Sequence, residues 1–464
     1  MDDWSLAGAI LCGLAYLAGA RWLEGRTRET ALTLLPVLFF VLFINGGRLL
    51  TFRIHRLDQF TIFEILVVYA LIGRWVMRQM TGTAREAVLV ALNLAGILLI
   101  LSHGQFSQLG LYLDLIGVFY LTMWWFANQP RNWPWLAFFT PLMALAFLRY
   151  GATDVESLYL WSRTRPGLGW EHLAQTLTAL TGVSYLVFRC SRLVLEVRNG
   201  QVNRPNFLEY INFAFFLPTM LVGPINTYAN FRRGFEGNYV VPAGRALLRV
   251  LVGAVKYFFL GTICNQLTYS GLLRDGFSHH GMDLPVAMLF FYFYLYLNFS
   301  GMCDIAIGFA GLMGIAVPEN FANPFAARNV KDFWNRWHIT LSAWMRDIVF
   351  SPLSKYLVGK FGLNQANQAI AVTIVVVFLL IGIWHGAALN FAVYGAVHAL
   401  GVVVNHYYTI WLKRKLGRDE FKAYNENRWI HGAAVGITFC YCGGSLIFFA
   451  NSFSQIADIL SSLK

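Results

Sequence analysis

The sequence predicts an all-α membrane protein that crosses the bilayer many times. Of its 464 residues, 57% are hydrophobic and only 13% are charged, whereas a soluble domain carries roughly 25% charged residues. Apolar runs of about 20 residues, enough to span a ~30 Å hydrocarbon layer as a helix, recur along the chain. A large soluble enzyme would need many more charges to cover its surface. We therefore expect roughly 11–13 transmembrane or re-entrant helices.

The basic residues of the chain fall in the short loops between the apolar runs. The formal net charge is +12, which in a soluble protein would suggest a nucleic-acid partner. Basic loops beside apolar runs are better explained by membrane topology and by attraction to anionic lipid. We therefore expect membrane lipid, and no nucleic acid, among the partners. The first residues, Met1-Asp2-Asp3-Trp4, lack the positive charge of a signal peptide, so we expect the first apolar run to be retained.

Residues 1–150 are predicted to form a scaffold of transmembrane helices that carries no chemistry. Their apolar runs contain almost no buried polar group. Tryptophans gather at the ends of the later runs, as expected for anchors at the membrane–water interface: Trp124, Trp125, Trp133 and Trp135. The runs occupy residues 5–23, 31–44, 60–80, 84–101, 109–126 and 133–148.

Residues 151–464 are predicted to form the functional core, which begins with a polar excursion at 151–169. The run at 207–225 contains Pro218, which predicts a kinked helix whose freed backbone groups are buried in protein. The run at 284–315 is too long for one straight span and carries Asn298, Ser300 and Asp304 in its middle. An acid at that depth indicates either a functional group or one half of a structural ion pair with an arginine. Further runs follow at 369–384, 387–412 and 433–450.

Residues 318–360 are polar and aromatic, and they separate two apolar regions. Large apolar side chains recur there at helical spacing. This pattern predicts an amphipathic helix that lies at the membrane surface or forms part of a re-entrant pair. The residues of the stripe are Phe333, Trp337, Leu341, Trp344 and Ile348.

His385 is the first candidate for chemistry. Residues 361–412 contain no Asp, Glu, Lys or Arg, and a titratable group inside such a stretch is costly and calls for a reason. A histidine there can be a general base, a metal ligand, a member of a proton relay or a hydrogen-bonded structural residue. We expect no metal site, because His398 and His406 lack local ligand spacing and none of the six cysteines has zinc-ligand spacing. For His338, the spacing alone favours a structural role as an anchor of the surface helix over a role in chemistry.

The loops that flank residues 361–412 are both strongly basic, which places both in the cytoplasm. The turn at His385 then lies toward the far side of the membrane. The helix before it has about sixteen residues, or ~24 Å, too short to cross a ~30 Å core. We therefore expect His385 to lie somewhat below the outer face and His338 nearer the cytoplasm, so that one site is approached from two sides.

Several motifs of this chain resemble those of the bacterial membrane-bound O-acyltransferases. The resemblance extends over residues 182–450 and is closer to the teichoic-acid D-alanyltransferase branch than to the alginate O-acetyltransferase branch. Its motifs fall at residues 182–225 and 298–398. They are Gly182-Val-Ser-Tyr-Leu-Val-Phe-Arg189, Gly223-Pro224-Ile225, Asn298-Phe-Ser-Gly-Met-Cys-Asp304, Pro318-Glu-Asn-Phe321, Asp332-Phe-Trp-Asn-Arg-Trp-His338, Trp384-His385-Gly386 and Tyr394-Gly-Ala-Val-His398.

The resemblance implies a multi-pass protein of the bacterial cell (inner) membrane, in which a ring of tilted helices surrounds a thin core with a central funnel. It implies that His385 is the essential catalytic residue and that His338 lines the path from the cytoplasm. From the same resemblance we expect five further motif residues to line the substrate path: Asn298, Asp304, Asn335, Trp337 and Trp384. Residues 346–357 correspond to a docking surface for an acyl-carrier protein with a phosphopantetheine arm, here carried by Arg346, Ile348, Val349, Phe350 and Lys355.

The function that the resemblance implies is O-acyl transfer. A D-alanyl or acetyl group would move from the thioester of a cytoplasmic carrier protein to hydroxyl groups of a teichoic acid or exopolysaccharide outside the membrane. No bound cofactor is expected. An accessory envelope protein could take part on the acceptor side. His385 would take the hydroxyl proton and return it to the departing thiolate. The alternative is a proton-coupled transporter or flippase for a lipid or saccharide, with His385, Asp304 and His338 as a relay. A third interpretation is a non-catalytic membrane scaffold.

Overall fold

The computed structural model describes residues 59–102, 106–130, 132–150, 182–237, 239, 241–274 and 277–463. All regular elements in this part of the chain are helices, as predicted. Seven of them are long and apolar enough to cross a membrane: Gln59–Gln79, Gly82–Leu101, Gln108–Phe126, Ala243–Gln266, Asp283–Met313, Leu363–His385 and Arg428–Ala450. The spans predicted at 5–23 and 31–44 and the polar excursion at 151–169 lie outside the described residues.

The chain divides into two compact units. The first comprises Met1–Val250 and Ala306–Val317, and the second comprises Leu251–Ile305 and Pro318–Lys464. The predicted boundary near residue 150 remains a prediction.

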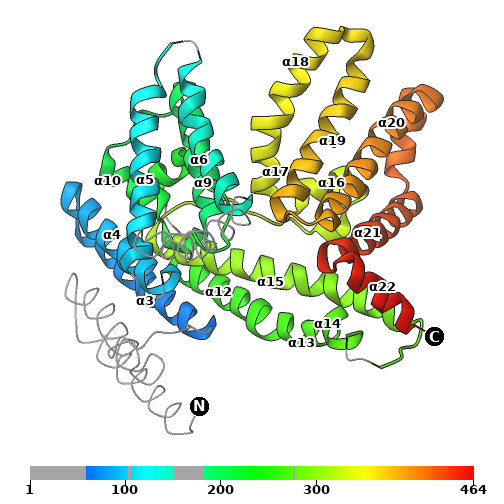
Figure 1. Cartoon of the computed structure of the whole chain (residues 1–464), viewed down its shortest axis with the longest axis horizontal. Helices are drawn as coiled ribbons and strands as arrows, with labels where there is room; N and C mark the ends of the chain where they lie inside the picture. Colours follow the sequence, from blue (N-terminus) through cyan, green and yellow to red (C-terminus); the bar gives the residue numbers. More distant parts are fainter. Residues whose placement is uncertain are drawn as a thin grey trace, which may run out of the picture. The chain divides into compact units, whose positions relative to one another are not determined.

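In the first unit the four described runs of the scaffold are helical, as the sequence predicts. Each apolar run ends at a polar or turn-forming residue, so the local pattern is enough to place it. The helices are α3 (Gln59–Gln79), α4 (Gly82–Gly96) with its π-helical continuation η2 (Ile97–Leu101), α5 (Phe106–Phe126) and α6 (Trp133–Tyr150). They appear in blue to cyan in Figure 1.

The predicted helix at 207–225 is wrong, because helix α10 (Phe207–Ala214) ends before Pro218, which lies in the 3₁₀ turn η3 (Leu217–Thr219). The carbonyl groups released at this end need donors. The buried side chain of Arg189, on α9 (Val183–Arg198), supplies them. Its Nη1 donates to the carbonyls of Phe213 (3.1 Å) and Ala214 (3.3 Å), and its Nη2 donates to that of Thr219 (2.7 Å).

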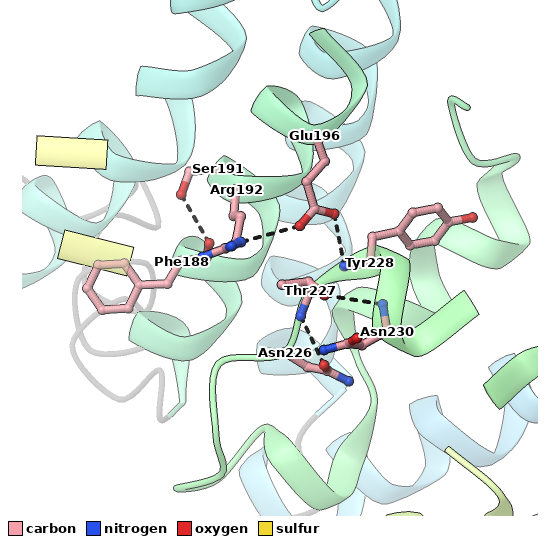
Figure 2. Close-up of polar contacts among 8 residues, drawn as sticks. All are labelled: Phe188, Ser191, Arg192, Glu196, Asn226, Thr227, Tyr228 and Asn230. Carbon is pink, nitrogen blue, oxygen red and sulfur yellow. Dashed lines mark hydrogen bonds and ion pairs between the residues drawn. The ribbon is translucent and has the colours of Figure 1, made fainter. Parts of the chain in front are cut away.

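The C-terminal half of α9 is fixed to the start of α11 (Tyr228–Phe235) by the carboxylate of Glu196. This carboxylate accepts hydrogen bonds from Nε of Arg192 (3.3 Å) and from the backbone N–H of Tyr228 (3.1 Å), as Figure 2 shows. The Thr227 hydroxyl caps the same helix by accepting from the N–H of Asn230 (3.2 Å). An acid at a helix N-terminus satisfies free N–H groups and suits the helix dipole.

In the second unit the long helix α15 (Asp283–Met313), whose last residues belong to the first unit, is continuous over 31 residues. It packs against the chain that leaves α12 (Ala243–Ala254) through the π-helix η4 (Val255–Leu260) into α13 (Gly261–Gln266). The two backbones approach closely at Gly253 and Gly301. A Cβ atom on Gly253 would lie 2.6 Å from the Gly301 carbonyl oxygen, so small residues set this contact, as is common between membrane helices.

The polar aromatic segment is not one amphipathic helix. It forms α16 (Val330–Arg336), α17 (Ile339–Met345), the π-helix η6 (Arg346–Phe350) and α18 (Ser351–Phe361). The break falls at His338, whose φ of 47° is left-handed. The predicted apolar stripe is nevertheless buried at four of its five positions: Phe333, Trp337, Leu341 and Trp344.

Three long helices follow in this unit: α19 (Ala366–His385), α20 (Leu389–Glu426, kinked at Gly417) and α21 (Arg428–Ala450). In Figure 1, α18 and α19 run antiparallel, and α20 lies beside α19. A final helix that the sequence did not indicate, α22 (Phe453–Ser462), follows. Because α19 has 20 residues, about 30 Å at 1.5 Å per residue, the argument that it is too short to cross the core is wrong.

Candidate functional site

His338 is held by the side chain of Asn320 within the second unit. Its Nδ1 lies 3.2 Å from Oδ1 of Asn320, and the same oxygen accepts from the backbone N–H (3.1 Å) and the hydroxyl (2.9 Å) of Thr340. Nδ2 of Asn320 donates to Sγ of Cys303 (3.3 Å). A backbone N–H can only donate, so the atom that faces it is the amide oxygen. This network therefore assigns the imidazole proton to Nδ1 and leaves a lone pair on Nε2.

The imidazole of His338 is buried among aromatic rings. The ring of Phe299 lies edge-on with its centroid 4.7 Å away, and the Trp384 ring lies 6.4 Å away. His338 lies in the connection between α16 and α17, outside the spanning helices, and burial lowers its pKa, with a further contribution from His385. The residue is therefore neutral near pH 7.

His385 is the last residue of α19, and its ring is enclosed by aromatic side chains without being fully buried. The Trp384 ring is a neighbour of both histidines, since its centroid is 4.6 Å from that of His385 and 6.4 Å from that of His338. The centroids of Phe449, Tyr394 and Phe391 lie 4.9, 6.1 and 6.5 Å away. The imidazole is therefore held among aromatic rings and is still partly accessible to a reactant.

A close crossing of α19 and α20 sets the position of His385. Gly382 lies one helical turn before His385, and a Cβ atom on it would collide with the carbonyl oxygen of Phe391. A Cβ atom on Gly395 of α20 would collide with the carbonyl oxygen of Phe378 on α19. The two glycines face each other, so the two helix backbones are in contact at this point. This contact fixes the position of His385 along the axis of α19 and the direction in which its side chain leaves the helix.

His398 joins three helices beside this site, a role that the sequence did not reveal. Its ring is fully buried, and its Nδ1 accepts from Nε1 of Trp334 on α16 (3.2 Å). Ser445 on α21 donates its only proton to the Cys442 carbonyl (2.7 Å), so the 2.9 Å contact to His398 must be donated by Nε2 of the histidine. Both ring nitrogens of His398 therefore form hydrogen bonds between helices. The ring centroid of Tyr394 lies 4.6 Å from that of His398.

The other predicted substrate-path residues do not all gather at the histidines. Trp337 is buried and stacks on Phe333 (5.4 Å). Asn335 is exposed, and Asn298 is half-buried on α15. Asp304 is bound by Lys256, with Nζ and Oδ2 2.7 Å apart. This ion pair favours the structural alternative for Asp304, although the partner is a lysine where the sequence analysis named an arginine.

The predicted carrier-docking residues form a mixed basic and apolar surface. Arg346 begins η6 and is exposed, as is Lys355 on α18. The half-buried residues between them are Ile348, Val349 and Phe350. They lie in a π-helical turn, a distortion that occurs frequently at functional sites. The sequence analysis predicts no role for the side chain of Asn320 or for the hydrogen bonds of His398, although both residues lie in the motifs quoted above.

Comparisons with known proteins agree with the motifs. The family model for MBOAT, the membrane-bound O-acyltransferase family, matches residues 157–424, more than half of the chain. The chain is similar to the teichoic acid D-alanyltransferases of Streptococcus thermophilus (33% identical, covering 57% of this chain and 66% of that protein) and Bacillus subtilis (31%, 61% and 71%). It is also similar to the peptidoglycan O-acetyltransferase of Helicobacter pylori (30%, 44% and 38%). The chain thus spans about two thirds of the length of the first two relatives.

Proposed function

Because this chain belongs to the membrane-bound O-acyltransferase family, we propose that it moves a short acyl group from a thioester to a hydroxyl group of an extracytoplasmic cell-envelope polymer. The observation that carries this proposal is a pair of histidines that share one neighbour. The ring centroid of Trp384 is 4.6 Å from that of His385 and 6.4 Å from that of His338. One imidazole is partly exposed and can meet a reactant, and the other is buried with a fixed tautomer.

The chemistry needs one base. His385 accepts the proton of the acceptor hydroxyl while the oxygen attacks the thioester carbonyl carbon. The C–O bond forms, the C–S bond breaks, and the protonated imidazole returns its proton to the departing thiolate. Direct transfer requires no acyl-enzyme. The neutral His338 offers a lone pair on Nε2, which suits it to orient a group on the donor side of the site.

The similarity to two proteins named teichoic acid D-alanyltransferases favours a D-alanyl group and a teichoic acid acceptor over an acetyl group. The donor proposed is the phosphopantetheine thioester of a carrier protein on the cytoplasmic side. Arg346, which also pairs with Asp347 (Nε to Oδ1 3.2 Å), and Lys355 are exposed on either side of three apolar residues. This surface matches an acidic carrier that inserts an apolar contact. The half-buried residues 348–350 would supply that contact.

The test uses purified full-length protein in lipid nanodiscs, D-alanyl carrier thioester and a glycerol-phosphate polymer. Mass spectrometry should detect a new ester that depends on the protein, and an acetyl thioester should serve as a poorer donor. A transporter or flippase would yield no ester, which would overturn the proposal. A charge-reversed Arg346→Glu/Lys355→Glu variant should raise the carrier concentration needed for half-maximal rate, whereas Arg414→Glu/Arg418→Glu, with the same charge change on α20, should not.

A further inference from the structure

The first unit contains an open polar pocket of about 710 Å³ that shares no residue with the histidine site. Its volume falls in the range of roughly 300–1,000 Å³ that is typical of ligand sites. The pocket lies where α5 ends, α9 ends and the following loop turns back. It is lined by Ala127, Asn128, Gln129, Val197, Arg198, Gly200, Val202, Asn203 and Arg204.

The charge of the pocket is entirely positive. Arg198 and Arg204 contribute two guanidinium groups, and none of the nine described lining residues is acidic. In the neighbouring pocket of about 420 Å³, by contrast, Arg232 is neutralised by Glu236, with Nε and Oε1 2.6 Å apart. Arginine recognises phosphate groups through several N–H donors held in one plane. The pocket therefore fits a phosphate.

Tryptophan side chains hold the two arginines in place. The guanidinium of Arg198 lies 4.8 Å over the Trp135 ring, and that of Arg204 lies 5.5 Å from the Trp124 ring. Nη1 of Arg204 also donates to the Trp124 carbonyl (2.6 Å). This uses one of five guanidinium donors. The remaining donors are available to a ligand without a large loss of side-chain freedom.

The position of the pocket relative to the bilayer selects the kind of phosphate. Exposed tryptophans at the adjoining ends of α5 and α6 (Trp124, Trp125 and Trp133) mark the membrane–water interface. Exposed apolar side chains continue from there along both helices: Val118 and Leu121 on α5, and Leu136, Phe139 and Met143 on α6. Acyl chains can pack on this surface while a headgroup occupies the pocket.

The geometry points to a binding site for the phosphate headgroup of one anionic phospholipid, with Arg198 and Arg204 as its cationic ligands. A free phosphate shares the headgroup chemistry but would make no use of the apolar surface below the tryptophans. Lipid binding at this pocket does not depend on acyl transfer, so the two proposals can be tested separately.

The test uses native mass spectrometry and thermal unfolding of the full-length protein in detergent with added phosphatidylglycerol. Arg198→Gln/Arg204→Gln should weaken retention of one lipid by roughly tenfold or more, because each arginine near anionic lipid contributes about fivefold. Arg414→Gln/Arg418→Gln, which removes the same charge from α20, should leave this lipid in place. Phosphatidylcholine and inorganic phosphate should stabilise the protein less than phosphatidylglycerol.

Asn203→Asp provides a second variant that is nearly isosteric and exposed, so it tests the pocket even where the double variant fails to fold. Its carboxylate should weaken phosphatidylglycerol retention as well. Unchanged retention in the pocket variants, or an equal loss in the α20 control, would overturn the site. Equal stabilisation by inorganic phosphate alone would overturn the lipid as its occupant.

Discussion

At the scale of single residues, Asn320 decides which nitrogen of His338 carries the proton. Its amide oxygen receives three hydrogen bonds from residues 18 and 20 positions further along the chain. Asn320→Asp keeps these acceptors and adds a negative charge beside the imidazole. Burial lowers the pKa of His338 in the native protein. A negative charge beside the imidazole acts in the opposite direction and raises this pKa.

Asn320→Asp should therefore shift the pH dependence of the transfer rate. If the neutral form of His338 is the active one, activity falls as pH decreases through its pKa, so a raised pKa moves the acid limb of the rate profile to higher pH. Because burial lowers the pKa of His338 to about 3 in the native protein, the transfer rate should be measured from about pH 3 to about pH 8 to show this shift. An acid limb that coincides with that of the native protein would show that His338 has no such role.

We expect His398 to contribute mainly to the stability of the fold. His398→Ala removes a fully buried ring and leaves the indole N–H of Trp334 without its acceptor. Cavity formation and the unsatisfied donor together should cost about 3–5 kcal/mol. Thermal unfolding followed by tryptophan fluorescence should show a large fall in Tm. A Tm equal to that of the native protein would contradict the assigned packing role.

At the scale of elements, the crossing of α19 and α20 is the contact that the site depends on. Gly382→Val inserts a branched side chain where even a Cβ atom would collide with the Phe391 carbonyl. The helices must move apart, which typically costs about 1–3 kcal/mol and displaces His385. We expect the transfer rate to fall at least about tenfold, since misplacement of a base by 1 Å has effects of this size or larger.

The matched control for Gly382 is Gly436→Val on α21. A Cβ atom on Gly436 would have no neighbour within 4 Å, so the same substitution in another spanning helix adds no collision. Its transfer rate and Tm should match those of the native protein. Similar losses in both variants would mean that the crossing at Gly382 has no special part in placing His385.

At the scale of the whole molecule, the sequence predicts the elements far better than the contacts between them. The runs at 60–80, 109–126, 133–148 and 433–450 appear as helices because composition and end residues are local signals. The break at His338 and the end of α10 at Ala214 were missed, since distant partners stabilise them: Asn320 in the first case and Arg189 in the second.

The candidate site shows the same division. The residue types and their motifs were sufficient to single out His385 and His338. Their surroundings were not predictable, because the partners are far apart in sequence: Lys256 and Asp304 are separated by 48 positions, and His398 and Ser445 by 47. Such pairs form only when helices pack, and no local periodicity encodes them.

The most direct test of the account is a single-turnover measurement on His385→Ala. With purified protein in nanodiscs and a loaded carrier, both loss of the thioester and appearance of the ester should fall to the uncatalysed rate, because no base remains to take the hydroxyl proton. Carrier binding and Tm should be retained, since the ring is only partly buried. Transfer at the native rate in this variant would contradict the central claim.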